Sequence, residues 1–187
     1  MISKPAIPVL VLLPEDAHTD YKALFSIATA YAHSGLLVSE HAKKTDRLEF
    51  TFPAIVCSSF SIELFLKFFL MLERADSNKP SVKKNFGHGL LDLWKQITPQ
   101  YQQLIVGMFR SPTKAPQWNV HKRQIEIFVE ALENIGETPF VKWRYVYELS
   151  DITLMSHHSI AEVLDALGWA AEYVMKERRE RDLRNSE

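Results

Sequence analysis

Apolar residues recur at three- and four-residue spacing along most of this chain, the period of an α-helix that packs on one side. The first such stretch runs from residue 16 to about 44, with Gly35 as a candidate break. The acidic residues Asp16 and Asp20 near its start suit the N-terminus of a helix. We therefore predict a long first helix over 16–44.

The second stretch, from residue 53 to about 74, is apolar on nearly every side, and Pro53 suits the first turn of a helix. Such a helix belongs at the centre of a bundle. By length it could mimic a membrane span. However, it carries Glu63 and Lys67 near its middle, and each such charge costs about 2.5 to 3.5 kcal/mol at a bilayer centre. We therefore expect the core helix of a soluble protein.

Shorter helical stretches follow in the second half of the chain. The pattern places them at 90–97, 99–109, 121–134 and from 151 or 156 to 184. Residues 140–149 alternate aromatic and polar side chains, which fits a short strand or an extended segment. The fold class predicted is therefore all-α, an up-and-down helical bundle of four to six helices. It forms one domain over residues 16–184, behind an N-terminal leader at 1–15.

Charge and cysteine content narrow the function classes. The 187 residues include 22 Lys or Arg and 23 Asp or Glu, for a formal charge of −1. This balance gives no global attraction to nucleic acid or to an anionic membrane. The single cysteine, Cys57, lies in the predicted core helix and cannot form an internal disulfide, which favours a reducing, cytoplasmic location. The five-residue apolar run near the N-terminus is too short for a secretory signal.

Three segments together resemble the HEPN superfamily of small prokaryotic helical-bundle proteins. They are 61–67 (SIELFLK) in the core helix, 87–93 (GHGLLDL) after a loop, and 141–148 (VKWRYVYE) before the final helix. The resemblance covers roughly residues 50 to 180. It implies a helical bundle that is commonly dimeric. Some members are metal-independent ribonucleases of toxin–antitoxin and anti-phage systems, and others are non-catalytic partners of nucleotidyltransferases or larger defence proteins.

The ribonuclease members carry an arginine, four to six intervening residues, and a histidine near the start of the last helix. No arginine of this chain precedes a histidine at that spacing. The resemblance therefore implies a non-catalytic interaction or regulatory protein without a cofactor, working in prokaryotic stress, toxin–antitoxin or anti-phage biology. Its expected partners are a second copy of itself and a nucleotidyltransferase or defence protein.

The alternative is a metal-independent ribonuclease with a relocated site around His88 and Arg144. Histidine supplies an acid or base near neutral pH, and arginine holds a phosphate through two hydrogen bonds. The candidate residues are Glu63, Lys67, His88 and Arg144, joined by Tyr147 or Glu148. The same residues can instead form an ion network that fixes helix register, because a charge on an apolar helix must be paired.

Other features support weaker hypotheses. His157 and His158 are adjacent, so on a helix they point about 100° apart and favour a surface role over a metal site, even with Glu162 one turn later. Basic groups at 43–47, 79–84, 114–123 and 178–181, with aromatics such as Phe86 and Trp118 nearby, keep an RNA contact open. The aromatic segment 143–147 contains residue types enriched at interfaces and predicts a homodimer. A regulator that binds a small molecule or nucleotide beneath the core helix is a third possibility.

Overall fold

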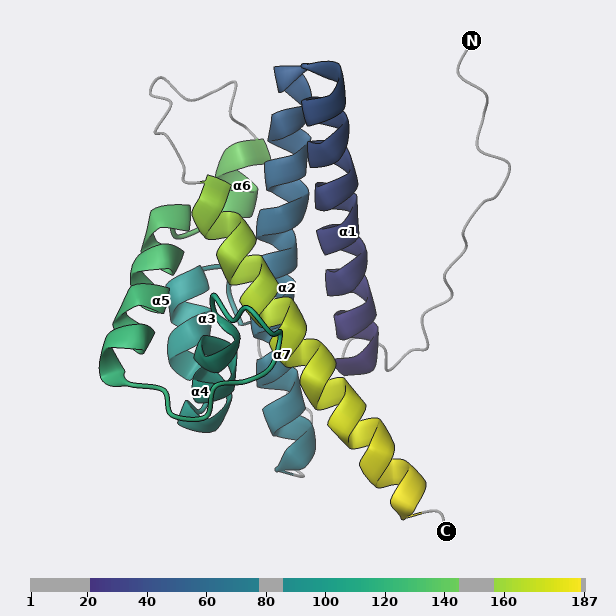
Figure 1. The fold of residues 1–187 in the computed structure, drawn as a ribbon, viewed down its shortest axis with the longest axis vertical. Coiled ribbons are helices and arrows are strands. Elements are labelled where there is room, and N and C mark those ends of the chain that lie inside the picture. The colour runs from purple at the N-terminus through teal and green to yellow at the C-terminus, as the bar shows by residue number, and fades with distance from the viewer. Residues whose placement is uncertain (1–20, 78–85, 145–156, 186–187) are drawn as a thin grey trace.

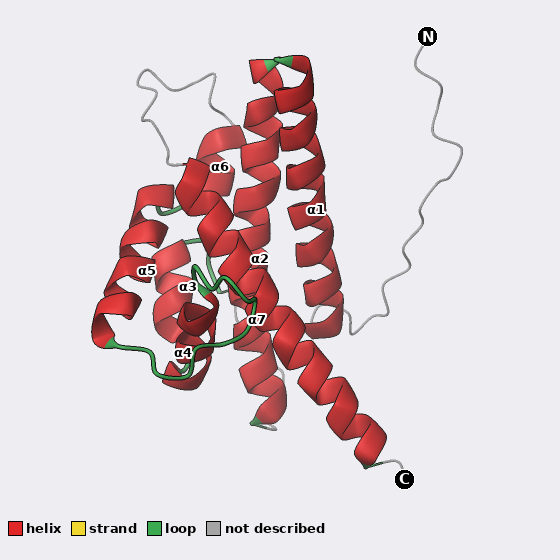
Figure 2. Ribbon diagram, viewed as in Figure 1, coloured by secondary structure: helices red, strands yellow, loops and turns green. Residues whose placement is uncertain are grey.

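The computed structural model describes residues 21–77, 86–144 and 157–185 (Figure 1). The elements are α1 (Tyr21–Thr45), the short 3₁₀ turn η2 (Leu48–Phe50), α2 (Thr51–Asp76), α3 (Leu90–Gln96), α4 (Pro99–Met108), α5 (Lys122–Ile135), α6 (Pro139–Arg144) and α7 (His157–Arg184). These residues form helices and loops without any strand (Figure 2), which confirms the predicted all-α bundle. The predicted leader at 1–15 lies outside the described residues.

Helices α1 and α2 form a long antiparallel pair joined by η2 (Figure 1). The prediction that Gly35 breaks the first helix is wrong, because α1 continues through it. Gly35 is buried against α2, where an added Cβ would overlap Ser58 Oγ and lie 3.1 Å from the carbonyl oxygen of Ala54. The hydroxyl of Ser61 donates a hydrogen bond of 2.7 Å to the carbonyl of Ala28. Small residues at this contact let the two backbones approach closely.

Helix α2 is the centre of the core, as its apolar sequence predicts. Its largest fully buried side chains are Ile62, Leu66, Phe68, Phe69 and Leu72. Helix α7 packs across it with the fully buried Val163, Leu167, Ala170 and Ala171. The stretch Leu48–Asp76 is long and apolar enough to cross a membrane, but 72% of its most apolar window is buried inside the protein. The bundle itself therefore accounts for the hydrophobicity of α2.

The segment at 140–149 is not the strand or extended segment that its alternation suggested, as far as it is described. Residues 139–144 form α6, whose Phe140 stacks on Phe60 and whose Trp143 stacks on Phe52. Two aromatic residues three positions apart share one face of a helix, so both can pack on α2. Residues 139–144 are therefore helical because a helix lets both aromatic side chains pack against α2. The other helices lie close to their predicted ranges.

The loop between α4 and α5 lies directly on α4 at Gly107. The backbone N–H of Gln117 donates a 3.0 Å hydrogen bond to the carbonyl of Gly107. A Cβ on Gly107 would lie 2.5 Å from the carbonyl oxygen of Gln117. The missing side chain therefore allows the loop to pack on α4, and with it Trp118, the residue that follows.

We expect Gly107→Ala to lower the free energy of unfolding by about 1 to 3 kcal/mol, because the overlap with the loop exceeds the gain of up to about 1 kcal/mol in helix propensity. Gly168→Ala in α7 is the matched control, since the nearest atoms to its added Cβ are in the Phe65 ring at 3.9 Å. The control should leave stability unchanged or raise it. Urea denaturation measures both, and equal effects of the two substitutions would contradict the packing argument.

Candidate functional site

Three of the four candidate residues meet between α2 and the turn that precedes α3. The carboxylate of Glu63 is buried, with its side chain 3% exposed, and its Oε1 atom lies 2.7 Å from Lys67 Nζ. The same oxygen lies 2.9 Å from His88 Nδ1. The buried carboxylate of Glu63 is thus shared by a cation one turn later on α2 and by an imidazole from another segment.

Two glycines and one backbone hydrogen bond position His88. Gly87 has a φ of +74°, a left-handed conformation that suits glycine, and Gly89 is the residue that caps the start of α3. The N–H of the buried Leu90 donates a 2.9 Å hydrogen bond to the carbonyl of Glu137. The pattern Gly-His-Gly therefore serves to bend the chain so that His88 reaches Glu63 while α3 enters the core.

In this cluster the buried charge of Glu63 has two polar partners, and one of them, His88, is accessible to solvent. A carboxylate beside one imidazole nitrogen fixes the orientation and tautomer of the ring. The side chain of His88 is 57% exposed. It lines none of three cavities found among the described residues, which lie around Tyr101, Trp169 and Phe86. The cluster thus has a group that could move a proton, but these cavities provide it with no enclosed site for a substrate.

The fourth candidate, Arg144, is the last residue of α6, and its side chain lies outside the described part of the protein, as do Tyr147 and Glu148. Its neighbour Trp143 stacks on Phe52 with ring centroids 6.2 Å apart. Phe52 precedes Glu63 by eleven residues of α2, a rise of about 16 Å. The backbone therefore places Arg144 near the start of α2, away from the level of Glu63 and His88.

The aromatic segment proposed as an interface is in part a core element. Trp143 is buried against α2 within its own chain, so it is not a surface anchor for a partner. Residues 145–147 of that segment lie outside the described residues. The dimer prediction therefore loses the support of Trp143 and needs another surface.

Glu162, the carboxylate that could have joined the histidine pair in a metal site, is paired with an arginine instead. The carboxylate of Glu162 accepts two hydrogen bonds from Arg110, 2.6 Å from Nε and 2.8 Å from Nη2. The Arg110 guanidinium lowers the pKa of Glu162. His158 Nε2 lies 3.1 Å from the same carboxylate and its side chain is exposed, while the side chain of His157 lies outside the described residues. Glu162 therefore holds the loop after α4 on α7.

Cys57 is half-buried on α2, and burial raises the pKa of its thiol. A raised pKa reduces the thiolate fraction near neutral pH, and the thiolate is the reactive form. Cys57 therefore packs as a small apolar residue, in keeping with its place in the sequence pattern.

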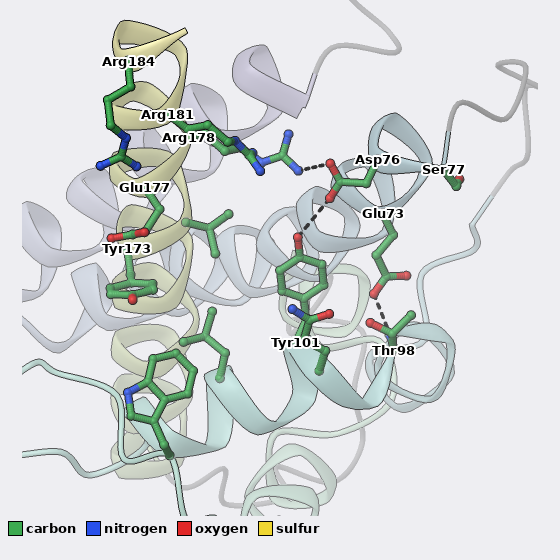
Figure 3. A pocket seen from close by; sticks show the side chains of 14 residues that line it. Glu73, Asp76, Ser77, Thr98, Tyr101, Tyr173, Glu177, Arg178, Arg181 and Arg184 are labelled. Carbon is green, nitrogen blue, oxygen red and sulfur yellow. Dashed lines mark hydrogen bonds and ion pairs between the residues drawn. The ribbon is translucent and has the colours of Figure 1, made fainter.

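The sequence alone did not reveal a cavity of about 560 Å³ where α2, α4 and α7 meet. Trp118, Tyr101 and Tyr173 line it together with Arg178, Arg181 and Arg184 (Figure 3). The sequence pointed to Trp118 and to the basic group at 178–181 as separate features. The fold brings them together across sixty residues of chain.

Polar contacts fix one wall of this cavity. Arg178 forms an ion pair with Asp76, and the hydroxyl of Tyr101 donates a 3.2 Å hydrogen bond to the other oxygen of Asp76. The carboxylate of Glu73 accepts a 2.7 Å hydrogen bond from the N–H of Thr98 (Figure 3). Burial raises the pKa of Tyr101. These contacts join the end of α2 to α4 and α7.

A second groove, of about 470 Å³, runs between α1 and α7 over α2. Its walls include Leu36 on α1 and Trp169 on α7, and small residues such as Gly35 and Ala54 form its floor. It is thus more apolar in character than the cavity beside Tyr101.

Comparisons with protein-family models, curated proteins and solved structures find no match to this chain.

We expect Lys67→Met to lower the free energy of unfolding by about 3 kcal/mol, because it leaves the Glu63 carboxylate buried without its cation. Replacing both members of the pair, with Glu63→Leu and Lys67→Met together, should recover most of that loss, since an apolar pair removes the desolvation cost. Urea denaturation measures all variants.

Lys95→Met is the matched control, because Lys95 pairs with Asp92 at 3.8 Å where both side chains are exposed. It should change stability by less than about 0.5 kcal/mol. A Lys67→Met effect no larger than this control would contradict the structural role of the cluster.

Proposed function

We propose that this chain is a non-catalytic interaction or regulatory protein, a HEPN-like bundle that acts as a homodimer in the cytoplasm of a prokaryote. Its setting is stress, toxin–antitoxin or anti-phage biology, with a nucleotidyltransferase or a larger defence protein as a candidate second partner. The order of the segments at 61–67, 87–93 and 141–148 supports the family, and the all-α bundle is compatible with it.

The observation that carries the interaction role is the placement of exposed apolar side chains. Among the described residues, eight large apolar side chains are exposed, and six of them lie on α1, η2 and the first turn of α2. They are Ile27, Tyr31, Leu36, Leu37, Leu48 and Phe52, and we call them the hairpin surface. Ile27 and Leu36 lie about 180° apart around α1, so the six side chains surround the hairpin of α1 and α2 and do not share one face. Exposed apolar side chains gathered on one element mark a region for association. A second copy of the chain would cover the same surface on both subunits.

The geometry around Glu63 supports a role without catalysis. The candidate acid and base are occupied in balancing a buried charge, and they line none of the three cavities. The backbone also separates Arg144 from them along α2. A nuclease would need these groups to converge on one phosphate.

One observation favours the alternative, a metal-independent ribonuclease. His88 is exposed while its Nδ1 atom lies beside the buried Glu63 carboxylate, and a carboxylate in that position supports a general base. This second candidate function is decided by an activity assay.

We expect sedimentation velocity to show a dimer at tens of micromolar, and Leu37→Lys to shift it toward monomer. Burying a lysine in an apolar interface costs free energy, and the lost leucine contact removes about 1.5 to 3 kcal/mol more. Leu183→Lys is the control, because Leu183 is 61% exposed, close to the 66% of Leu37, and lies far along the chain on α7. A wild-type protein that stays monomeric, or an equal effect of the two substitutions, would reject the hairpin surface as a dimer interface.

Purified protein incubated with mixed RNA in EDTA should leave the RNA intact. The His88→Ala variant should behave in the same way, because the proposed role requires no proton transfer at this residue. Gel electrophoresis measures the RNA. Cleavage by the wild type that disappears in His88→Ala would replace the proposed function with the ribonuclease.

A further inference from the structure

The groove between α1 and α7 is long and has a floor of small residues. Its volume of about 470 Å³ lies within the range typical of small-molecule pockets. On α1 its wall follows one stripe, from Thr29 through Leu36 to Lys43, which rises about 21 Å. Gly35 and Ala54 form the floor where α1 packs on α2. A ligand that follows this stripe is therefore elongated.

The middle of the groove is apolar on both walls. Helix α7 contributes four apolar side chains, which are Ile160, Ala161, Leu164 and Trp169. On the wall of α1, Leu36 remains 57% exposed although it lines the groove. Removing exposed apolar surface from water drives the binding of apolar groups. The middle of the groove therefore favours a hydrocarbon chain.

One end of the groove presents a positive charge. Lys43 follows Gly35 by eight residues of α1, so it lies about 12 Å further toward η2. It is exposed and has no ion pair within the part of the chain that the structure describes. Ser39 lines the same wall one turn earlier, and its hydroxyl can donate a hydrogen bond. An ammonium group beside a hydroxyl suits a carboxylate.

The acidic residues of the groove lie toward its other end. Asp165 and Glu172 line it on α7, each about one turn from Gly168. The ring of Phe65 lies next to Gly168, and it also contacts the ring of Phe25 near the start of α1, with centroids 6.4 Å apart. The acidic side chains are therefore near the start of α1, whereas the positive end is near its last turn.

A second cation, Lys114, belongs to the acidic end. Its Nζ atom lies 5.2 Å from the centroid of the Trp169 ring. Burial raises the pKa of Asp165, and the nearby Lys114 ammonium opposes that rise. The charge of Lys114 is therefore partly balanced within the protein, whereas Lys43 has no ion pair among the described residues. The groove thus combines one unbalanced cation with an apolar length beside it.

We propose that this groove binds a long-chain carboxylate, a fatty acid, with its carboxylate on Lys43 and its hydrocarbon chain along the apolar walls toward Trp169. The acyl chains of one bilayer leaflet span about 15 Å, half of the hydrocarbon core. Such a chain fits within the stripe of about 21 Å on α1. The groove shares only Leu36 with the hairpin surface, so the site does not depend on the homodimer.

Isothermal titration calorimetry of the full chain tests the proposal with dodecanoate, hexanoate and dodecyltrimethylammonium, each below its micellar concentration. Dodecanoate should bind. Hexanoate should bind at least about tenfold more weakly, because it buries half as much hydrocarbon. Dodecyltrimethylammonium should also bind at least about tenfold more weakly, because Lys43 repels its head group. The Leu37→Lys variant should bind dodecanoate as the wild type does, since Leu37 does not line the groove, which separates this proposal from the dimer.

Lys43→Gln should weaken dodecanoate binding by about tenfold or more, because it removes a hydrogen bond between charged groups. Lys44→Gln is the matched control, since Lys44 pairs with Glu40 at 3.8 Å and does not line the groove. It should change the affinity by less than about twofold.

Ala161→Phe should also weaken dodecanoate binding by about tenfold or more, because the larger side chain fills the space of the hydrocarbon chain. Ala161 is exposed, so the fold should accept the substitution. Ala30→Phe is the matched control, because Ala30 is exposed on α1 outside the groove. Circular dichroism verifies that each variant is folded.

Three outcomes would overturn the proposal. The first is an absence of dodecanoate binding at millimolar concentration, which would leave the groove to a protein partner or a second copy of the chain. The second is dodecyltrimethylammonium binding as tightly as dodecanoate, which would remove any role for the contact with Lys43. The third is an Ala30→Phe effect equal to that of Ala161→Phe, which would place the binding elsewhere on the protein.

Discussion

Helix α2 is apolar on nearly every side, so it must be covered on every side, and the rest of the bundle does this. Helix α1 lies along one side with Gly35 at the close approach, and α7 crosses another side with a row of alanine and small apolar residues. Helix α6 covers the first turns through Phe140 and Trp143. Each of these segments is helical where its burial against α2 requires one apolar face. The arrangement in Figure 1 follows from this requirement.

The same burial controls the charge that α2 contains. A carboxylate inside an apolar helix needs partners, and Glu63 finds one in Lys67 on its own helix and one in His88 from the turn before α3. The glycines on both sides of His88 make this contact possible. Because the cluster secures the packing of α2 against α3, a catalytic role for it would have to coexist with a structural one. The open surface around His88 gives a substrate little enclosure.

Features suited to binding lie at the two ends of α2 instead. Exposed apolar side chains lie along α1, η2 and the first turn of α2, and arginines and aromatic rings line one cavity where α2 ends beside α4 and α7. The two regions lie at different levels of α2, since Tyr31 contacts Phe60, sixteen residues before Asp76 at the cavity.

The sequence by itself determined the helices, the central place of α2 and the Glu63–Lys67 pair, because each follows from periodicity over a few turns of chain. It also indicated that His88 belongs with that pair, through an argument about unpaired charge. It did not determine that α1 passes through Gly35 or that residues 139–144 are helical, since both depend on what α2 offers to them. Only the tertiary structure joined Arg110 to Glu162 and Trp118 to the arginines of α7. Contacts between segments fifty or sixty residues apart depend on how the helices pack. The spacing of apolar residues within one helix does not specify that packing.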